Sequence, residues 1–164
     1  MLSKPTIIER PAQPYLAIRE KVTMPFNAVV DRVFPEFFGW MGQHGIPFSD
    51  APFIKYNCID MARELELEFG APVAEPMQGD SRVVAGTIPA GRYGLITWQG
   101  GYDKLVAANG ALIDWAREQG IRWDMEATPE GDRFAGRLEI YRTDPAAEPD
   151  PSKWVTDILI KVAD

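Results

Sequence analysis

The chain has 164 residues, of which 46% are hydrophobic, enough for one domain with a substantial core. Its 17 Lys and Arg against 24 Asp and Glu give a formal charge of -7, which disfavours direct binding to nucleic acid or to anionic membranes. One cysteine excludes an internal disulfide, and no apolar run approaches the roughly 20 residues of a membrane span. Since the N-terminus also lacks a signal-peptide pattern, we expect a cytoplasmic protein.

The first half of the chain is predicted to form a strand, a helix and two further strands. Residues 6–20 carry apolar positions interrupted by two prolines, which suits a broken strand near a sheet edge. Apolar residues at helical spacing over 26–41 predict an amphipathic helix. Residues 52–57 and 63–69 predict the two strands.

The second of these strands alternates regularly between apolar and acidic residues. Its acidic positions, Glu64, Glu66 and Glu68, should share one face, and we expect that face to be solvated. The three carboxylates resemble a metal cluster only superficially, because no histidine accompanies them. We therefore assign no metal site.

The second half repeats this order of elements. Strands are predicted at residues 83–88, 93–98, 137–141 and 154–162, with an amphipathic helix over 102–116 and a loop over 124–133.

A short motif recurs at the end of both predicted helices. Trp40 is followed, after four residues, by Gly45-Ile46, and Trp115 is followed in the same way by Gly120-Ile121. Together with the matching element order, this indicates an internal duplication covering about residues 5–75 and 82–162 of a single domain, 1–164. The predicted fold is α+β: duplicated strand-helix-strand-strand units form one antiparallel sheet, with two helices on one face and a central ligand groove between them.

The strand at 137–141 carries the residue on which the functional interpretation depends. Side chains alternate along a strand, so Glu139 and Tyr141 point one way while Leu138 and Ile140 point the other. Two interpretations stay open on the residues alone. Glu139 faces water on a one-sided sheet, or it is a lone acid on the floor of an aromatic cleft.

The order and spacing of four segments resemble the GyrI-like, or AraC-type effector-binding, small-molecule-binding family over essentially the whole chain. These segments are Ile88-Pro89-Ala90-Gly91-Arg92-Tyr93, Gly100-Gly101-Tyr102-Asp103-Lys104-Leu105, Leu138-Glu139-Ile140-Tyr141 and Trp154-Val155-Thr156-Asp157-Ile158. Regulators of this family carry a separate DNA-binding module. Because this chain has no residues left for one, it resembles a stand-alone member.

The resemblance implies that Glu139 lies on the floor of the groove and pairs with lipophilic, often cationic, multi-ring ligands. A carboxylate among aromatic rings is poorly solvated, so a flat cation that stacks on the rings and neutralises the acid is favoured. The candidate wall residues are Tyr56, Tyr141, Trp98, Trp115 and Phe38. Each of them could equally be an ordinary core residue.

The resemblance suggests binding or sequestration of such ligands, and it leaves two alternatives. One is a hydrolase that opens the cyclopropane ring of DNA-alkylating compounds by adding water, with Glu139 as the candidate catalytic residue that orients or deprotonates the water and Trp98 or Trp115 stabilising the electrophile. The other is interaction with a protein partner such as DNA gyrase. No phosphate-loop spacing is present, so no cofactor is expected, and the sequence does not indicate an oligomeric state.

Overall fold

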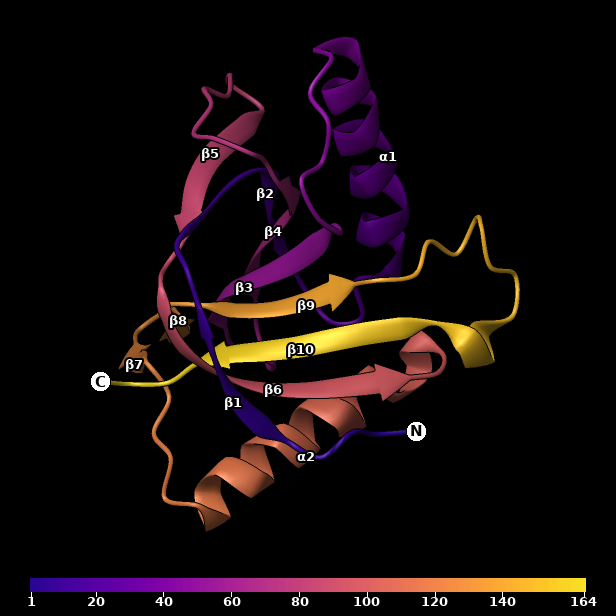
Figure 1. Ribbon diagram of the computed structural model, residues 1–164. Helices are drawn as coiled ribbons and strands as arrows, with labels where there is room; N and C mark the ends of the chain where they lie inside the picture. Colours follow the sequence, from indigo (N-terminus) through magenta and orange to yellow (C-terminus); the bar gives the residue numbers. More distant parts are fainter.

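The computed structural model describes residues 1–164, which form a strongly curled antiparallel sheet with two helices (Figure 1). The strands are β1 (Thr6–Arg10), β2 (Gln13–Val22), β3 (Phe53–Ile59), β4 (Leu65–Pro72), β5 (Val83–Ile88), β6 (Gly91–Gln99), β7 (Met125–Thr128), β8 (Gly131–Phe134), β9 (Arg137–Tyr141) and β10 (Val155–Lys161). The helices are α1 (Asn27–Gln43) and α2 (Leu105–Glu118), with 3-10 turns η1 (Tyr102–Lys104) and η2 (Pro151–Lys153).

The strand order shows the predicted duplication directly. Eight strands follow the path β1-β6-β10-β9-β3-β4-β2-β5 in the sheet. The unit β2-α1-β3-β4 is therefore repeated, with the same order of elements, by the unit β6-α2-β9-β10. The two units meet where β3 pairs with β9, and there Ile54 lies opposite Glu139. The strand that precedes each unit pairs with the other unit: β1 with β6, and β5 with β2. The predicted fold class is confirmed.

Both helices cover the same face of the sheet, which we call the helix face. Helix α1 buries Val33, Phe37 and Met41 against β2, β3 and β4, and α2 buries its own apolar stripe against β6 and β10. Tyr141 of β9 packs against both of these apolar clusters, so the clusters adjoin at the centre of the sheet. In Figure 1, β9 and β10 lie between the two helices. No helix combines the length and the apolar character that a membrane crossing needs.

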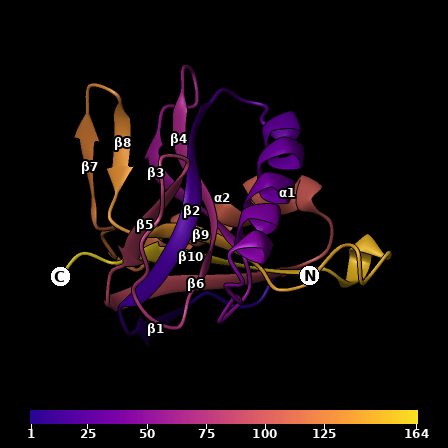
Figure 2. The same ribbon diagram turned by 90° about the horizontal axis from the view of Figure 1, so that it is seen from above.

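The loop predicted over residues 124–133 is wrong, because a hairpin of β7 and β8 occupies it. Figure 2 shows this hairpin projecting from the sheet on the side away from α1. Each of its strands has only four residues, and most of their side chains are exposed. Without a buried face the sequence has no apolar alternation, which is the signal that predicts strands. Gly131, with a φ of 132°, forms the turn.

The solvated acidic face predicted from Glu64, Glu66 and Glu68 is also wrong at its last residue, Glu68. Glu68 is only 1% exposed, and its carboxylate accepts hydrogen bonds from the Tyr15 hydroxyl at 2.9 Å and from Asn57 Nδ2 at 2.6 Å. Lys55 Nζ lies 4.0 Å from Glu68 Oε1. The physical reason is the curl of the sheet, which encloses its second face around an apolar cluster that includes Tyr15. Glu64, which precedes β4, is exposed as predicted.

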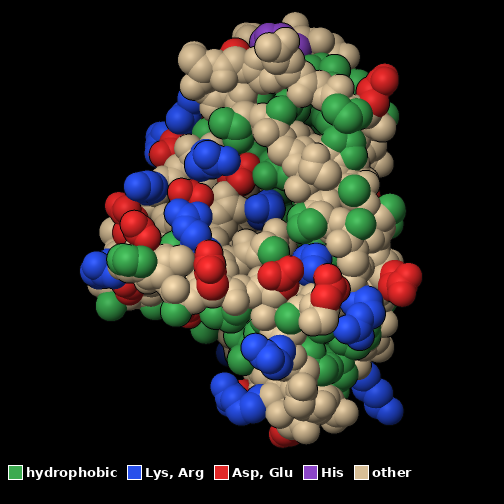
Figure 3. All heavy atoms as spheres, turned by 90° about the vertical axis from the view of Figure 1, so that its left-hand side faces the viewer, with side chains coloured by type: hydrophobic (Ala, Val, Ile, Leu, Met, Phe, Trp, Pro, Cys, Tyr) green, Lys and Arg blue, Asp and Glu red, His purple; other side chains and the backbone are tan.

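Charged side chains of both signs are intermixed on the side of the molecule that carries β5 and the β7–β8 hairpin (Figure 3). Two ion pairs tie strands or helices together across the surface: Arg82 contacts Glu36 of α1 at 2.7 Å, and Arg133 of β8 contacts Glu66 of β4 at 3.7 Å. Exposed pairs of this kind contribute little stability, about 0–1 kcal/mol each. The fold therefore depends mainly on its three buried apolar clusters.

Candidate functional site

Glu139 lies at the centre of the helix face, on the line where the two units meet. Its strand neighbours are Ile54 of β3 and Ile158 of β10, and both belong to the apolar clusters beneath the helices. Glu139 itself is only 6% exposed. Of the two interpretations that the sequence left open, a residue facing water on a one-sided sheet does not fit this burial.

The Glu139 carboxylate is held by three side chains from three different elements. Its Oε1 accepts hydrogen bonds from the hydroxyl of Tyr56 on β3 at 3.0 Å and from the hydroxyl of Tyr141 on β9 at 2.7 Å. Its Oε2 accepts one from Asn109 Nδ2 on α2 at 3.0 Å. Hydrogen bonds to the charged form stabilise a carboxylate that has little water around it.

The two tyrosines act as neutral donors. Burial raises the pKa of Tyr56 well above its ordinary value of 10.0, and the negative charge of Glu139 raises it further. Burial and the same carboxylate raise the pKa of Tyr141 in the same direction. Both phenols therefore keep their protons at neutral pH and direct them to Oε1 of Glu139.

The guanidinium of Arg137 lies near the Glu139 carboxylate but forms no ion pair with it. Arg137 is two residues before Glu139 on β9, so both side chains leave the same face of the strand. Its Nη2 donates to Asn109 Oδ1 at 3.3 Å, and its guanidinium carbon lies 4.7 Å from the centre of the Phe134 ring. Burial lowers the pKa of Arg137, while Tyr56 and Glu139 raise it.

An aromatic strip runs past Glu139 from α1 to the start of β10. It consists of Phe38, Phe34, Tyr141, Tyr102 and Trp154, each ring in contact with the next. Successive ring centres are 5.4, 6.2, 5.6 and 4.7 Å apart. Phe38 is 42% exposed and Tyr102 is 38% exposed, so rings on either side of Tyr141 face solvent. Such a strip can stack flat ring systems and attract cations to its ring faces.

The structure brings together three of the predicted site residues: Glu139, Tyr56 and Tyr141 are in direct contact. Phe38 lies at the far end of the aromatic strip, and Phe34 stands between it and Tyr141. Trp115 packs on the apolar cluster beneath α2, six residues along the helix from Asn109.

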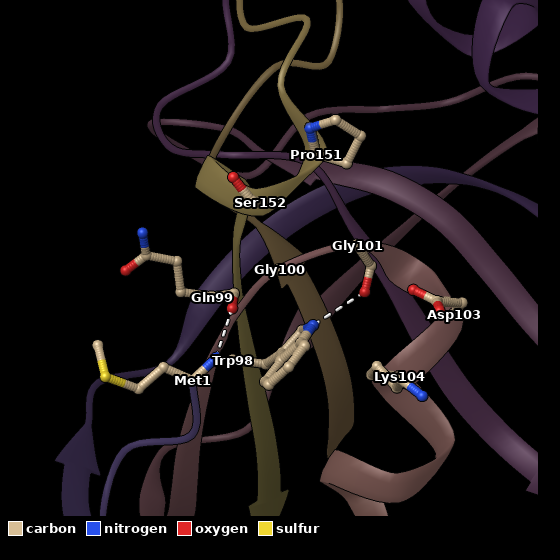
Figure 4. Close-up of a pocket in the computed structure, with 9 residues that line it drawn as sticks. All are labelled: Met1, Trp98, Gln99, Gly100, Gly101, Asp103, Lys104, Pro151 and Ser152. Atoms are coloured by element: carbon tan, nitrogen blue, oxygen red, sulfur yellow. Dashed lines mark hydrogen bonds between the residues drawn. The ribbon is translucent and has the colours of Figure 1, made fainter.

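Trp98 borders a separate cavity of about 520 Å³ at the start of α2 (Figure 4). Its indole N–H donates to the carbonyl oxygen of Gly101 at 2.9 Å, and the amino group of Met1 donates to the carbonyl oxygen of Gln99 at 2.7 Å. The remaining lining residues are Gly100, Asp103, Lys104, Pro151 and Ser152. Glu139 is not among the residues that line this cavity.

Sequence reasoning missed five residues around the acid: Phe34, Tyr102, Trp154, Asn109 and Arg137. Two signals were available for some of them. Arg137 has the same strand parity as Glu139, and Phe34 belongs to the apolar stripe of the first helix. Asn109 gave no signal, because one polar residue in a helix points to solvent as readily as to a buried carboxylate.

Comparison with known proteins places the chain in a family. The sequence profile of the GyrI-like small molecule binding domain matches residues 3–163. Among proteins with curated descriptions, no sequence relative is found.

Several solved structures share the fold. The crystal structure of the EcmrR C-terminal domain has 18% identity and a TM-score of 0.75, covering 98% of this chain and 98% of that one. In a complex of EcmrR with DNA, at the same identity and TM-score, the chain spans only 57% of the EcmrR chain. SAV2435 bound to tetraphenylphosphonium has 12% identity and a TM-score of 0.59, covering 98% and 94%. A hydrolase from Listeria innocua has 16% identity and a TM-score of 0.59, covering 98% and 92%.

Proposed function

The chain belongs to the GyrI-like family of small-molecule-binding domains, and from that premise we propose that it binds lipophilic, often cationic, multi-ring compounds between α1 and α2, over Glu139. The observation that carries this proposal is the placement of one buried carboxylate beside an aromatic strip, on the line where the two units meet. A flat cation there would stack on the rings and neutralise an acid that little water reaches.

Two further facts support the proposal. Cation–π contact with such rings contributes roughly 0.5–2 kcal/mol beyond the burial of the ligand's apolar surface. In addition, the structural neighbour SAV2435 was solved with tetraphenylphosphonium, a lipophilic cation with four aromatic rings. Aromatic walls accept many ring systems, so selection by size is expected to be loose.

Replacing Tyr102 tests the role of the aromatic strip. Tyr102 is 38% exposed and contacts Tyr141 edge-on and Trp154 at a tilt, so its ring is available to a ligand. Tyr102→Leu should weaken binding of a fluorescent planar cation about tenfold, because it keeps apolar bulk but removes the ring face, at a cost of roughly 0.5–2 kcal/mol. Tyr102→Phe, which keeps the ring, serves as the control and should bind within about twofold of wild type. Fluorescence anisotropy titrations measure both, and equal losses in the two variants would contradict stacking.

A second candidate is hydrolysis of cyclopropane-bearing DNA-alkylating compounds, favoured by the pairing of Glu139 with two neutral phenols. A carboxylate can take a proton from water as the water oxygen attacks the strained ring, while a phenol supplies a proton to the departing carbon or to a group conjugated with it. Two solved structures with this fold are described as hydrolases from Listeria innocua.

Product analysis decides between binding and hydrolysis. If the chain is a hydrolase, mass spectrometry of a cyclopropane alkylator after incubation should show a product heavier by one water. Glu139→Gln should slow its formation about a hundredfold or more, the usual size of a general-base contribution. Recovery of the unchanged compound, under conditions where anisotropy shows that it binds, rules out the enzymatic reading and leaves binding alone.

A further inference from the structure

The charges around Glu139 include one that no ion pair neutralises. Arg137 is partly buried on the helix face, and none of the ion pairs in the structure includes it. Its Nε is buried without any hydrogen-bond acceptor. An N–H left unpaired in this way costs about 1–3 kcal/mol, and more when it belongs to a charged group.

Asn109 stands between the cation and the acid. Its Oδ1 accepts from Arg137 Nη2 at 3.3 Å, and its Nδ2 donates to Glu139 Oε2 at 3.0 Å. The same Nδ2 also donates to the carbonyl oxygen of Leu105 one turn back, which fixes the amide on α2. The positive and negative charges are therefore held apart at a fixed spacing by one amide, and neither is fully compensated by the other.

A second unpaired polar atom lies on the same face. The hydroxyl of Thr156 on β10 is buried without a partner, and Thr156 lies directly opposite Tyr141. Arg137 and Tyr141 are at the two ends of β9, with Glu139 midway between them. Two of the three buried side-chain polar atoms without a partner in the whole molecule thus flank the carboxylate on the helix face.

We propose that Arg137 sets the ligand class of this site: it favours ring systems that carry a hydrogen-bond acceptor, such as a carboxylate or a carbonyl, together with a cationic or donor group for Glu139. The inference rests on the proposed function and narrows it. A zwitterion offers a partner to both protein charges: its anion or acceptor pairs with the Arg137 guanidinium, and its cation pairs with Glu139. A simple lipophilic cation satisfies Glu139 alone and is repelled by the guanidinium.

Two dyes with the same rings separate these classes. Rhodamine B carries a cationic xanthene and a free carboxylate, whereas its ethyl ester carries the same cation without the anion. The protein has a formal charge of -7, so its overall field favours the ester. Tighter binding of rhodamine B by the wild type, measured by anisotropy in moderate salt, is therefore expected only if a local cation receives the carboxylate.

Arg137→Met removes the cation while keeping a long apolar side chain over Phe134. Rhodamine B should lose at least tenfold in affinity and the ester should gain severalfold, so the preference inverts. Arg137→Lys keeps the charge and should preserve the wild-type order of the two dyes. Arg117→Met on α2 is the matched control, because Arg117 is 76% exposed and pairs only with Asp114; both dyes should bind it as they bind the wild type.

The outcomes separate this inference from the proposed function. If both dyes bind the wild type but Arg137→Met changes them by the same factor, Arg137 is structural and the inference is overturned, while the proposed function stands. If neither dye binds and tetraphenylphosphonium does not bind either, the proposed function fails and the inference fails with it. Thermal unfolding of each variant shows whether it is folded. If Arg137→Met does not fold, Glu139→Gln provides the test. Glu139→Gln leaves the Arg137 cation without a nearby counter-charge, so it should increase the preference for rhodamine B over the ester, and an unchanged preference overturns the inference.

Discussion

Glu139→Gln should reduce the affinity for a cationic planar dye by ten- to a hundredfold, or about 1.4–3 kcal/mol. The substitution keeps the shape of the side chain and an oxygen that can accept from Tyr56 and Tyr141, but it removes the charge. A cation held at the sheet centre, where Ile54 and Ile158 flank the acid, is weakly screened by water. The lost attraction is therefore large for a single charge.

A neutral dye of similar size provides the control for this experiment. It gains the same stacking on the aromatic strip but no charge pairing, so Glu139→Gln should change its affinity by less than about threefold, within the uncertainty of one weak hydrogen bond. Isothermal titration calorimetry of both dyes against the wild type and Glu139→Gln gives the four dissociation constants. Equal losses for the charged and the neutral dye would show that Glu139 supports the fold rather than the ligand.

Glu68→Ala should lower the free energy of unfolding by about 3–5 kcal/mol, a large part of the stability of a domain. Glu68 is 1% exposed, and it accepts hydrogen bonds from Tyr15 and Asn57 while facing Lys55. Its removal leaves the buried Lys55 ammonium without its ion-pair partner, and it leaves the Tyr15 hydroxyl and Asn57 Nδ2 without their acceptor. Urea unfolding followed by tryptophan fluorescence measures the loss.

Glu64→Ala is the matched control, because Glu64 belongs to the same acidic run and is exposed. Its effect on the free energy of unfolding should stay within about 0.5 kcal/mol.

The pH dependence of stability gives a second test of the role of Glu68. Burial lowers the folded-state pKa of Lys55, and the charge of Glu68 opposes this; without Glu68 that pKa falls further. Between the folded value and the unfolded one the unfolded chain binds more protons, so the stability of Glu68→Ala should rise with pH across that window. A loss that is the same at every pH would contradict a role for the Lys55 charge.

The sequence predicted the architecture because the duplicated elements repeat their periodicity. The strand with Leu138, Glu139 and Ile140 alternates cleanly, and the recurrence of Trp40 and Trp115 before Gly-Ile marks equivalent helix ends. Such signals depend only on residues that are close in the sequence, and the strands and helices that they predict are present in the structure. The contact of Tyr56 and Tyr141 with Glu139 also follows from parity, since all three lie on strands and on one face.

Features that depend on long-range geometry could not be predicted from the sequence. Glu68 and Glu64 look alike in the sequence, yet only the curl of the sheet buries one of them. In the same way, the rotation of α2 brings Asn109 to the carboxylate and carries Trp115 away from it. Periodicity indicates the apolar side of a helix, but it does not indicate which side chains of the helix contact a partner from another element.

A crystal structure of the protein with a bound cationic dye would show whether the ligand lies over Glu139. We predict that the rings of the dye lie beside Tyr102 and Tyr141, between α1 and α2. Its positive charge should lie within roughly 4–6 Å of the Glu139 carboxylate, the range over which opposite charges stabilise each other strongly. A dye seated instead in the cavity bordered by Met1, Trp98 and Gly101, with Glu139 still holding only its present partners, would contradict this prediction.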